Sequence, residues 1–190
     1  RGYSNAADVR KFAYWDVFAG AFGHTYGNHS IWQFYSPKKP AVNGPLDHWP
    51  IAKDKPGAAQ MQHLRTLIES RPFLTRIPDQ SLLAGDPSAG AKRILATRDS
   101  EGSYAFVYIP ASRSFAVNMD KLGGDVVRCW WFNPRSGTAS EFGQYPGKGT
   151  RSFTPPNEGE NTDWVLVLDR ADRKFKPPGL DAGGGPPTRQ

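Results

Sequence analysis

One short glycine-punctuated stretch, GAFGHTYGNHSIWQFYSP, concentrates the residue types that could do chemistry. It holds two imidazoles, a phenol, a carboxamide and an indole, contributed by His24, Tyr26, Asn28, His29 and Trp32. Such a set suits a sugar, because the apolar face of a sugar ring stacks on Trp or Tyr while imidazole and amide groups hydrogen-bond to its hydroxyls. We therefore predict that these five residues bind carbohydrate. The alternative is a satisfied core histidine among packed aromatic side chains.

Other chemistries are less well supported by the same stretch. His24 and His29 lie five residues apart, which places them on opposite faces of a strand, and no cysteine or carboxylate accompanies them at a zinc-binding spacing. The chain also lacks a G-x-S-x-G nucleophile elbow. We therefore expect no metal and no cofactor.

Glycoside hydrolysis needs two carboxyl groups on either side of the scissile bond. In the first third of the chain the carboxylates fall within predicted helices or a loop, and we expect none beside His24. They are Asp8, Asp16, Asp47, Asp54 and Glu69. The candidate site therefore has binding groups, and we predict no catalytic residue in it.

A helix must precede these residues. Ser4 or Asn5 can cap a helix that begins near Ala6, and glycines end it at 20 and 23. Apolar residues cover most of its circumference, so we expect neighbours on more than one side. GHTYG is then predicted to be a short buried strand, on which positions 24 and 26 point the same way. IWQFY is expected to be a further short extended or irregular segment.

Two more segments complete the first part of the chain, residues 1–72. Residues 36–57 contain five prolines and are predicted to form a long surface loop. A second helix is expected from Gly57 to about Ser70, and Arg71-Pro72 ends it. Two helices and two short strands cannot close a sheet. We therefore expect this part either to pack on the rest of the chain or, our preferred interpretation, to be the end of something larger.

Residues 73–175 have a different pattern. The runs ILATR, YAFVYIP, SFAVNM, VVRCWWFN and WVLVLD are bounded by turn sequences and predict an antiparallel β-sandwich. Residues 104–109 are apolar on both faces, which is typical of a central strand that also packs on another element. We expect Trp130 and Trp131 to be buried on opposite faces. The last segment, 176–190, is rich in Gly and Pro and is predicted to be a disordered tail.

Net charge, the length of the apolar runs and the number of cysteines exclude further classes of function. The 190 residues carry a net charge of +6, but Lys and Arg are scattered, so we expect no nucleic-acid partner. No apolar run approaches a membrane span, and the start of the chain does not resemble a signal peptide. Cys129 is the single cysteine and lies in an apolar run, which predicts a buried and unreactive thiol.

Several motifs in combination resemble a known family. DVRKFAYWDVFAGAFGHTYGNHSIWQF, NGPLDHW, PGAAQMQHLRTLIESRPF and PDQSLL resemble the closing segment of the apiosidase-like glycoside hydrolases. The later segment, from YAFVYIP through CWWFNPRSG to DWVLVLD, resembles the β-sandwich that follows their barrel and is catalogued as a collagen-binding domain. Together the two resemblances cover roughly residues 5–170.

The resemblance implies an α+β chain: the terminal βα units of an incomplete (β/α)8 barrel, residues 1–72, followed by the antiparallel β-sandwich. GHTYG would be the last barrel strand, with His24, Tyr26 and Trp32 at the sugar-binding end. The family's nucleophile lies in a G-E-P-x-Y-like motif that this sequence does not contain, and its acid/base carboxylate lies further upstream. The chain would then be a C-terminal fragment whose partners are carbohydrate, such as polysaccharide side chains, and the missing N-terminal barrel. A bacterial secreted or periplasmic location is also implied.

Two rival hypotheses remain open. The sandwich could be a non-catalytic module that binds carbohydrate or collagen, in which case Trp130, Trp131, Tyr145 or Trp164 should form a flat exposed platform. Alternatively, the chain could be a partial remnant without activity, which poorly cooperative thermal unfolding would reveal.

Overall fold

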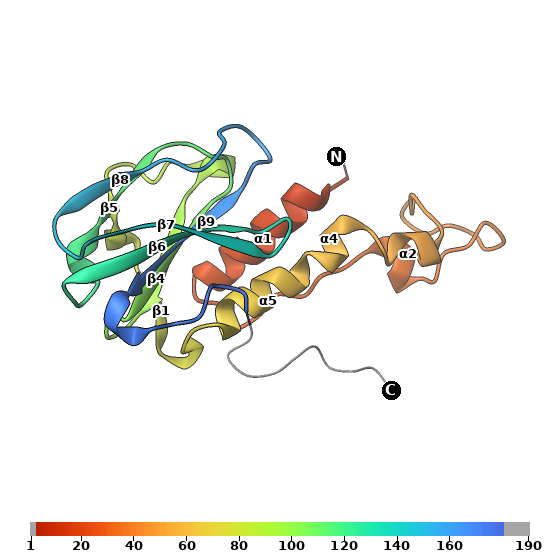
Figure 1. Ribbon diagram of the computed structural model, residues 1–190. Helices are drawn as coiled ribbons and strands as arrows, with labels where there is room; N and C mark the ends of the chain where they lie inside the picture. The colour runs from red at the N-terminus through yellow and green to blue at the C-terminus, as the bar shows by residue number, and fades with distance from the viewer. Residues whose placement is uncertain (1–2, 181–190) are drawn as a thin grey trace.

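The computed structural model describes residues 3–180 as three layers. Two antiparallel sheets face each other, and helices cover the outer face of the larger sheet (Figure 1). A long segment of the first part of the chain, which includes α2 (His29–Trp32), extends away from these layers. The helices are α1 (Ala6–Phe18), α2 (His29–Trp32), α3 (Trp49–Ala52), α4 (Pro56–Ala59) and α5 (Met61–Glu69).

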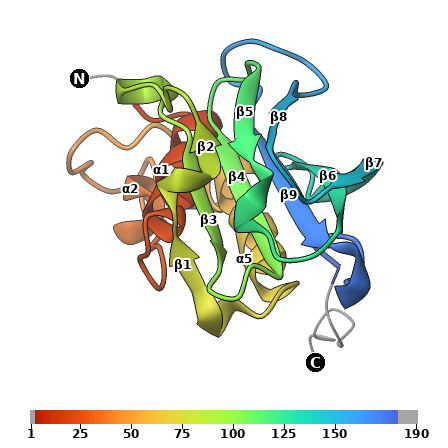
Figure 2. The same ribbon diagram turned by 90° about the vertical axis from the view of Figure 1, so that its left-hand side faces the viewer.

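The larger sheet has six strands in the order β1-β3-β4-β9-β6-β7, and the smaller has three in the order β2-β5-β8. Figure 2 shows the smaller sheet in front and the helices behind. Every strand pair is antiparallel. The strands are β1 (Arg76–Pro78), β2 (Leu83–Ala84), β3 (Leu95–Asp99), β4 (Tyr104–Ile109), β5 (Phe115–Asn118), β6 (Val126–Asn133), β7 (Thr138–Pro146), β8 (Thr150–Phe153) and β9 (Trp164–Arg170).

Helix α1 begins and ends where local chemistry requires it. The Asn5 side chain accepts hydrogen bonds from the amides of Ala7 and Asp8, and Asp8 accepts one from the Asn5 amide, which completes a capping box. Gly20 ends the helix with a φ of +109°, and a side chain there would collide with Pro78. This glycine lets the chain turn sharply toward the candidate site.

The larger sheet is apolar on both faces, as the alternation in β4 predicts. Ala105, Val107 and Ile109 point into the core between the two sheets, whereas Tyr104, Phe106 and Tyr108 point into a second core beneath the helices. Trp131 and Trp130 divide between these two cores in the same way. The expectations of a two-sided central strand and of oppositely buried tryptophans are confirmed.

The second core joins the two parts of the chain. Tyr14 and Phe18 of α1 and Leu67 of α5 are fully buried in it, against the aromatic face of β4. The rings of Tyr14 and Tyr108 stack with centroids 4.7 Å apart. The first part therefore packs on the sandwich, which was one of the two alternatives, and the preferred interpretation, that it is the end of something larger, stays a prediction. On the side of α1 away from the sheet, Phe12 is about half exposed.

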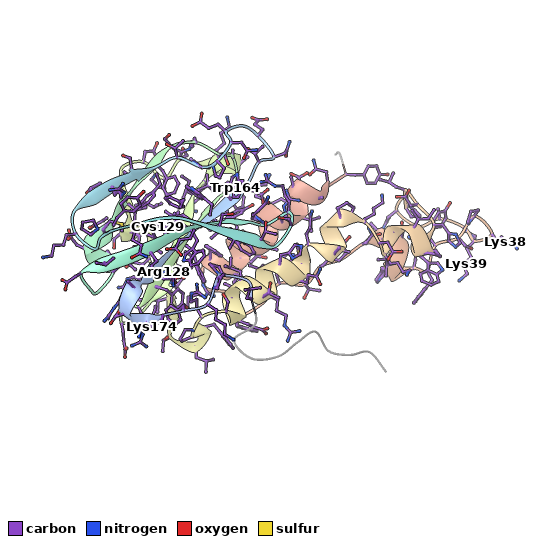
Figure 3. All side chains as sticks on the ribbon, viewed as in Figure 1. Lys38, Lys39, Arg128, Cys129, Trp164 and Lys174 are labelled. Carbon is purple, nitrogen blue, oxygen red and sulfur yellow. The ribbon has the colours of Figure 1, made fainter. Side chains whose placement is uncertain are left out.

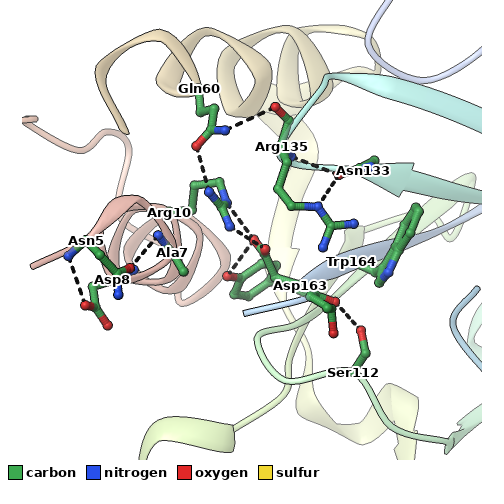
Figure 4. A network of polar contacts seen from close by, with 12 residues as sticks. Asn5, Ala7, Asp8, Arg10, Gln60, Ser112, Asn133, Arg135, Asp163 and Trp164 are labelled. Carbon is green, nitrogen blue, oxygen red and sulfur yellow. Dashed lines mark hydrogen bonds and ion pairs between the residues drawn. The ribbon is translucent and has the colours of Figure 1, made fainter. Parts of the chain in front are cut away.

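A buried polar network fixes how α1 lies on the sheet (Figure 4). The Arg10 guanidinium donates two hydrogen bonds, of 3.0 and 2.7 Å, to the carboxylate of Asp163 and a third, of 2.7 Å, to Gln60. Gln60 in turn donates to the Arg135 carbonyl at 3.2 Å, and Tyr108 donates to Asp163 at 3.3 Å. Burial lowers the pKa of the Arg10 guanidinium, but its bonds to Asp163 outweigh this and raise it.

A second buried pair lies just after α5. Arg71 donates two hydrogen bonds, of 2.8 and 2.6 Å, to the carboxylate of Asp169 on β9, and both side chains are completely buried. Such bidentate pairs have strict geometry, so they set the position of α5 as well as of α1.

Several predictions of secondary structure were wrong. GHTYG is not a strand, because no backbone hydrogen bond joins residues 23–27 to another segment between residues 3 and 180. The segment IWQFY is not extended either, since the four-residue helix α2, capped by Asn28, covers its start. Strands β1, β2, β7 and β8 were not predicted, because they are short or, in β7, mostly polar and exposed at the sheet edge.

The end of the chain differs in part from the predicted tail. Residues 176–180, expected to be disordered, form a turn in which the Leu180 amide donates to the Pro177 carbonyl, and Gly179 lies against Phe132. Residues 181–190 lie outside the described part of the chain. The mixed helix and antiparallel sheet architecture agrees with the α+β class that was expected.

We predict that Arg10→Met lowers the free energy of unfolding by about 3–5 kcal/mol, because Asp163 is left as a buried charge without its ion-pair partner. Arg65→Met is the matched control. Its ion pair with Glu69 is exposed on α5, so its loss should cost at most about 1 kcal/mol. Urea unfolding followed by fluorescence measures both, and equal losses would contradict the prediction.

Candidate functional site

His24 lies in the turn that follows α1, and its imidazole is mostly buried. Its Nδ1 is 2.7 Å from a carboxylate oxygen of Asp16 on α1, and 19% of the side chain is exposed. It lines an apolar hollow of about 320 Å³ between α1 and α5, together with Phe22, Leu64 and Glu69. The expectation that no carboxylate lies beside His24 was therefore wrong, because the turn at Gly20 folds residue 24 back onto the end of the helix.

Tyr26, Asn28 and His29 line a different and larger groove, with a volume of about 560 Å³. Its other walls come from three separate segments. These are the residues around the start of α1, the loop at residues 44–47 and the start of α4 at residues 55–57. The groove therefore lies at the positive end of the α1 dipole.

Two of the predicted binding residues also have structural roles. The Asn28 side chain accepts a hydrogen bond of 2.9 Å from the Ser30 amide and so caps α2. His29, the first residue of α2, packs edge-to-face on Trp32 with ring centroids 6.0 Å apart. Trp32 itself is 70% exposed and lies outside the residues that line the groove.

The five predicted residues therefore do not form one cluster in the described structure. Tyr26, Asn28 and His29 share the larger groove, His24 faces the apolar hollow, and Trp32 stands on the surface. Positions 24 and 26 would share a face only on a strand, and residues 23–27 are not one here.

Sequence reasoning missed four further residues at these sites. Asp16 contacts His24, and Tyr3, Asp47 and Lys55 line the larger groove. The Lys55 ammonium forms an ion pair with the Asp47 carboxylate. The motif NGPLDHW stood out only for its resemblance. Asp47 in this motif and Lys55, eight residues later, meet only because of the way the loop folds, which the sequence pattern does not reveal.

The described residues contain neither a group of side chains that could hold a metal ion nor a helix that could span a membrane. Between residues 3 and 180, no group of three or more His, Cys, Asp or Glu side chains is arranged to hold a metal ion. Within the same range, no helix has the length and apolar character needed to cross a bilayer.

The four aromatic residues expected to form a binding platform on the sandwich do not form a flat exposed surface. Trp130 and Trp131 are 5% and 6% exposed. Trp164 is half-buried beneath the Arg135 guanidinium, which lies 4.9 Å from its ring centroid, and Tyr145 is covered in the same manner by Arg151.

The basic residues labelled in Figure 3 are widely dispersed. Lys38 and Lys39 lie at the far tip of the 36–57 loop, whereas Arg128 and Lys174 lie at the opposite end of the molecule, on the sandwich. Cys129 is fully buried on β6 between the two sheets. Burial raises the pKa of its thiol to about 12.

Two family models and two solved structures are similar to the chain. Residues 1–75 match the family model "Apiosidase-like, catalytic domain", and residues 77–169 match "Putative collagen-binding domain of a collagenase". A solved structure titled "Glycoside hydrolase" is similar to 93% of this chain, with a TM-score of 0.88 and 33% identity. A "glycoside hydrolase family 5" structure from Bacteroides vulgatus ATCC 8482 is similar to 96% of it, with a TM-score of 0.87 and 32% identity.

These findings confirm the resemblance of the chain to apiosidase-like glycoside hydrolases, with the catalytic-domain match in the helical part and the collagen-binding match in the sandwich. The chain spans about two-fifths of the length of the two solved structures, 39% in each case. No curated protein matches the sequence.

We predict that Cys129 does not react with Ellman's reagent in the native protein at pH 8, because a thiol with a pKa of about 12 carries almost no thiolate at that pH and is also covered. One thiol should react once the protein is unfolded in guanidinium. Ser140→Cys, on the exposed side of β7, is the control and should react at once. Rapid labelling of the unsubstituted chain would contradict the prediction.

Proposed function

We propose that this chain is the C-terminal part of a polysaccharide-degrading glycoside hydrolase. In this proposal residues 1–72 close a (β/α)8 barrel, residues 73–175 support that barrel, and the catalytic carboxylates lie outside this sequence. The observation that carries the proposal is the groove in which Tyr26, Asn28 and His29 meet residues from three other segments.

The chemistry of the groove suits a sugar. Tyr26 offers an aromatic ring, His29 and Asn28 offer polar groups, and Asp47 and Lys55 add an acceptor and a donor. Its volume of about 560 Å³ falls within the range of roughly 300–1,000 Å³ that is typical of small-ligand sites. His24 and Trp32 are proposed to border the same site in the complete enzyme.

Exposed apolar residues of the first part, and of the turn directly after it, are a second argument for the barrel. Phe22 is fully exposed and Leu74 is 90% exposed, and Phe12 and Phe73 are each about half exposed. Phe22 and Phe73 line the apolar hollow beside His24, Phe12 lies on α1, and Leu74 follows Phe73 in the turn of the chain after α5. Large exposed apolar patches typically mark a surface that another element covers, and we propose that this element is the remainder of the barrel.

The alternative function, a carbohydrate- or collagen-binding module, has less support. Its aromatic residues should form an exposed platform, but Trp130 and Trp131 are buried, and the faces of Tyr145 and Trp164 are covered by arginines. The buried contacts with α1 and α5 favour a supporting role for the sandwich.

We expect the isolated 190-residue chain to show no turnover of aryl glycosides, because hydrolysis needs a matched acid and nucleophile or base around the bond. The same chain preceded by its upstream genomic sequence should hydrolyse a glycoside within a panel of plant polysaccharides. Release of nitrophenol by the pure 190-residue chain would contradict the proposal, as would an upstream sequence that encodes no barrel.

A substitution can test the barrel surface directly. Phe22→Ser should change the free energy of unfolding of the 190-residue chain by less than about 0.5 kcal/mol, since the side chain is fully exposed. In the longer protein the same substitution should cost about 3–5 kcal/mol, because the ring would be buried there.

Leu67→Ala is the control for this comparison. Leu67 is fully buried in the described chain, so its substitution should cost about 2–5 kcal/mol in both proteins. Chemical denaturation of the two proteins gives the values, and an equally small effect of Phe22→Ser in both would show that residue 22 has no partner.

A further inference from the structure

The larger groove contains an ion pair whose members the proposed function treats only as a general acceptor and donor, and the family matches assign it no role. The Asp47 carboxylate and the Lys55 ammonium are in direct contact, and 31% and 40% of their side chains are exposed. A half-exposed pair of this kind contributes little to stability. Its position in the wall of the groove therefore calls for another explanation.

The loop that carries Asp47 is held against the start of the chain. The Tyr3 hydroxyl donates a hydrogen bond of 3.0 Å to the Gly44 carbonyl. Asn43 and Gly44 both have φ in the left-handed region, at +53° and +60°, and a side chain at residue 44 would crowd the Tyr3 oxygen. This tight turn directs the following residues, Pro45 to Asp47, into the wall of the groove.

Lys55 is positioned from the other side. It is the N-cap residue of α4, and Pro56 occupies the first turn of that helix. Gly57 packs directly on α1, where a Cβ atom added to this glycine would lie 3.5 Å from Val9 and 3.6 Å from Ala6. The backbone next to Lys55 is therefore held against α1. Only the flexible side chain of Lys55 has to adopt the conformation that contacts Asp47.

The pair leaves most of the carboxylate free to bind. An ionised carboxylate has about four lone-pair positions. Besides the contact with Lys55, no hydrogen bond to Asp47 is formed by the side chains or backbone of residues 3–180. Two adjacent acceptor oxygens in a groove match two adjacent hydroxyl donors of a sugar ring.

We propose that Asp47 is a sugar-recognition residue that accepts hydrogen bonds from a vicinal diol of a neutral sugar unit, and that Lys55 positions its carboxylate. The inference rests on the proposed function, since it concerns the same groove as Tyr26, Asn28 and His29. It adds the group that is recognised: the two hydroxyls of a neutral diol are donors for the two oxygens of Asp47, whose charge Lys55 already balances.

The experiment compares ligands as well as variants. The 190-residue chain is titrated with the methyl glycosides of galactose, arabinose, xylose and rhamnose, and the amide signals of Gly27, Gly44 and Gly57 report binding in the groove. The best of these ligands is then compared with its analogue that lacks one hydroxyl of the diol. We expect the intact diol to bind about tenfold more tightly, because hydrogen bonds to a charged group are the stronger kind.

Asp47→Asn should weaken binding of the intact glycoside about tenfold and should abolish the preference over the deoxy analogue. Asp54→Asn is the matched control, because it removes the same charge from a residue of the neighbouring turn that does not line the groove and is largely exposed. It should leave both affinities unchanged. Lys55→Gln should weaken binding and keep the preference for the diol.

The outcomes separate the two proposals. If no glycoside shifts the groove signals of this chain, the inference is overturned, whereas the proposed function is decided separately by the hydrolysis assay on the longer protein. If glycosides bind but Asp47→Asn keeps the preference for the diol, the inference alone is overturned. If the unsubstituted chain binds the diol and the deoxy analogue equally, the inference is overturned without any variant, so the test does not depend on the folding of Asp47→Asn.

Discussion

The structure depends on a sheet that is apolar on both sides. Strand β4 alternates three aliphatic residues toward the smaller sheet with Tyr104, Phe106 and Tyr108 toward the helices, and β6 adds Trp130 and Phe132 to the helical side. Burial of each such side chain stabilises the fold by about 1.5–3 kcal/mol, so the five together contribute about as much as the whole free energy of unfolding of a typical domain. The helices are therefore part of the core of the sandwich.

Apolar packing alone would allow α1 to lie on the sheet in several orientations. The buried ion pairs select one of these orientations. Arg10 meets Asp163 at one end of the helical layer, and Arg71 meets Asp169 after α5 at the other. A misaligned helix would leave one of these charges buried and unpaired, which is far more costly than the gain from forming the pair. Because α1 is fixed in this way, its first residues, which form part of the groove wall, are fixed as well. The sandwich thus helps to place the candidate site without touching it.

The sequence predicted those features that local chemistry or periodicity determines. The cap at Asn5, the two-sided apolar strand at residues 104–109 and the buried thiol at Cys129 each follow from residue types at short spacing. The groove could not be predicted, because its walls come from four segments that only the fold brings together. The contact between Asp16 and His24 escaped notice for a related reason: it depends on the left-handed turn at Gly20, which reverses the chain after α1.

The incorrect prediction of a strand at residues 23–27 bears on the proposed function itself. A strand forms only where a neighbouring strand satisfies its backbone, and these residues have no such neighbour within the described chain. In the proposed barrel, residues 23–27 would have a neighbouring strand on each side and would themselves form a strand. Because side chains alternate between the two faces of a strand, His24 and Tyr26 would then lie on the same face. The hollow beside His24 and the groove beside Tyr26, which are separate in this structure, would become parts of one site. The sugar site and the barrel are therefore a single hypothesis, because the backbone pairing that completes the barrel also assembles the residues that would contact the sugar.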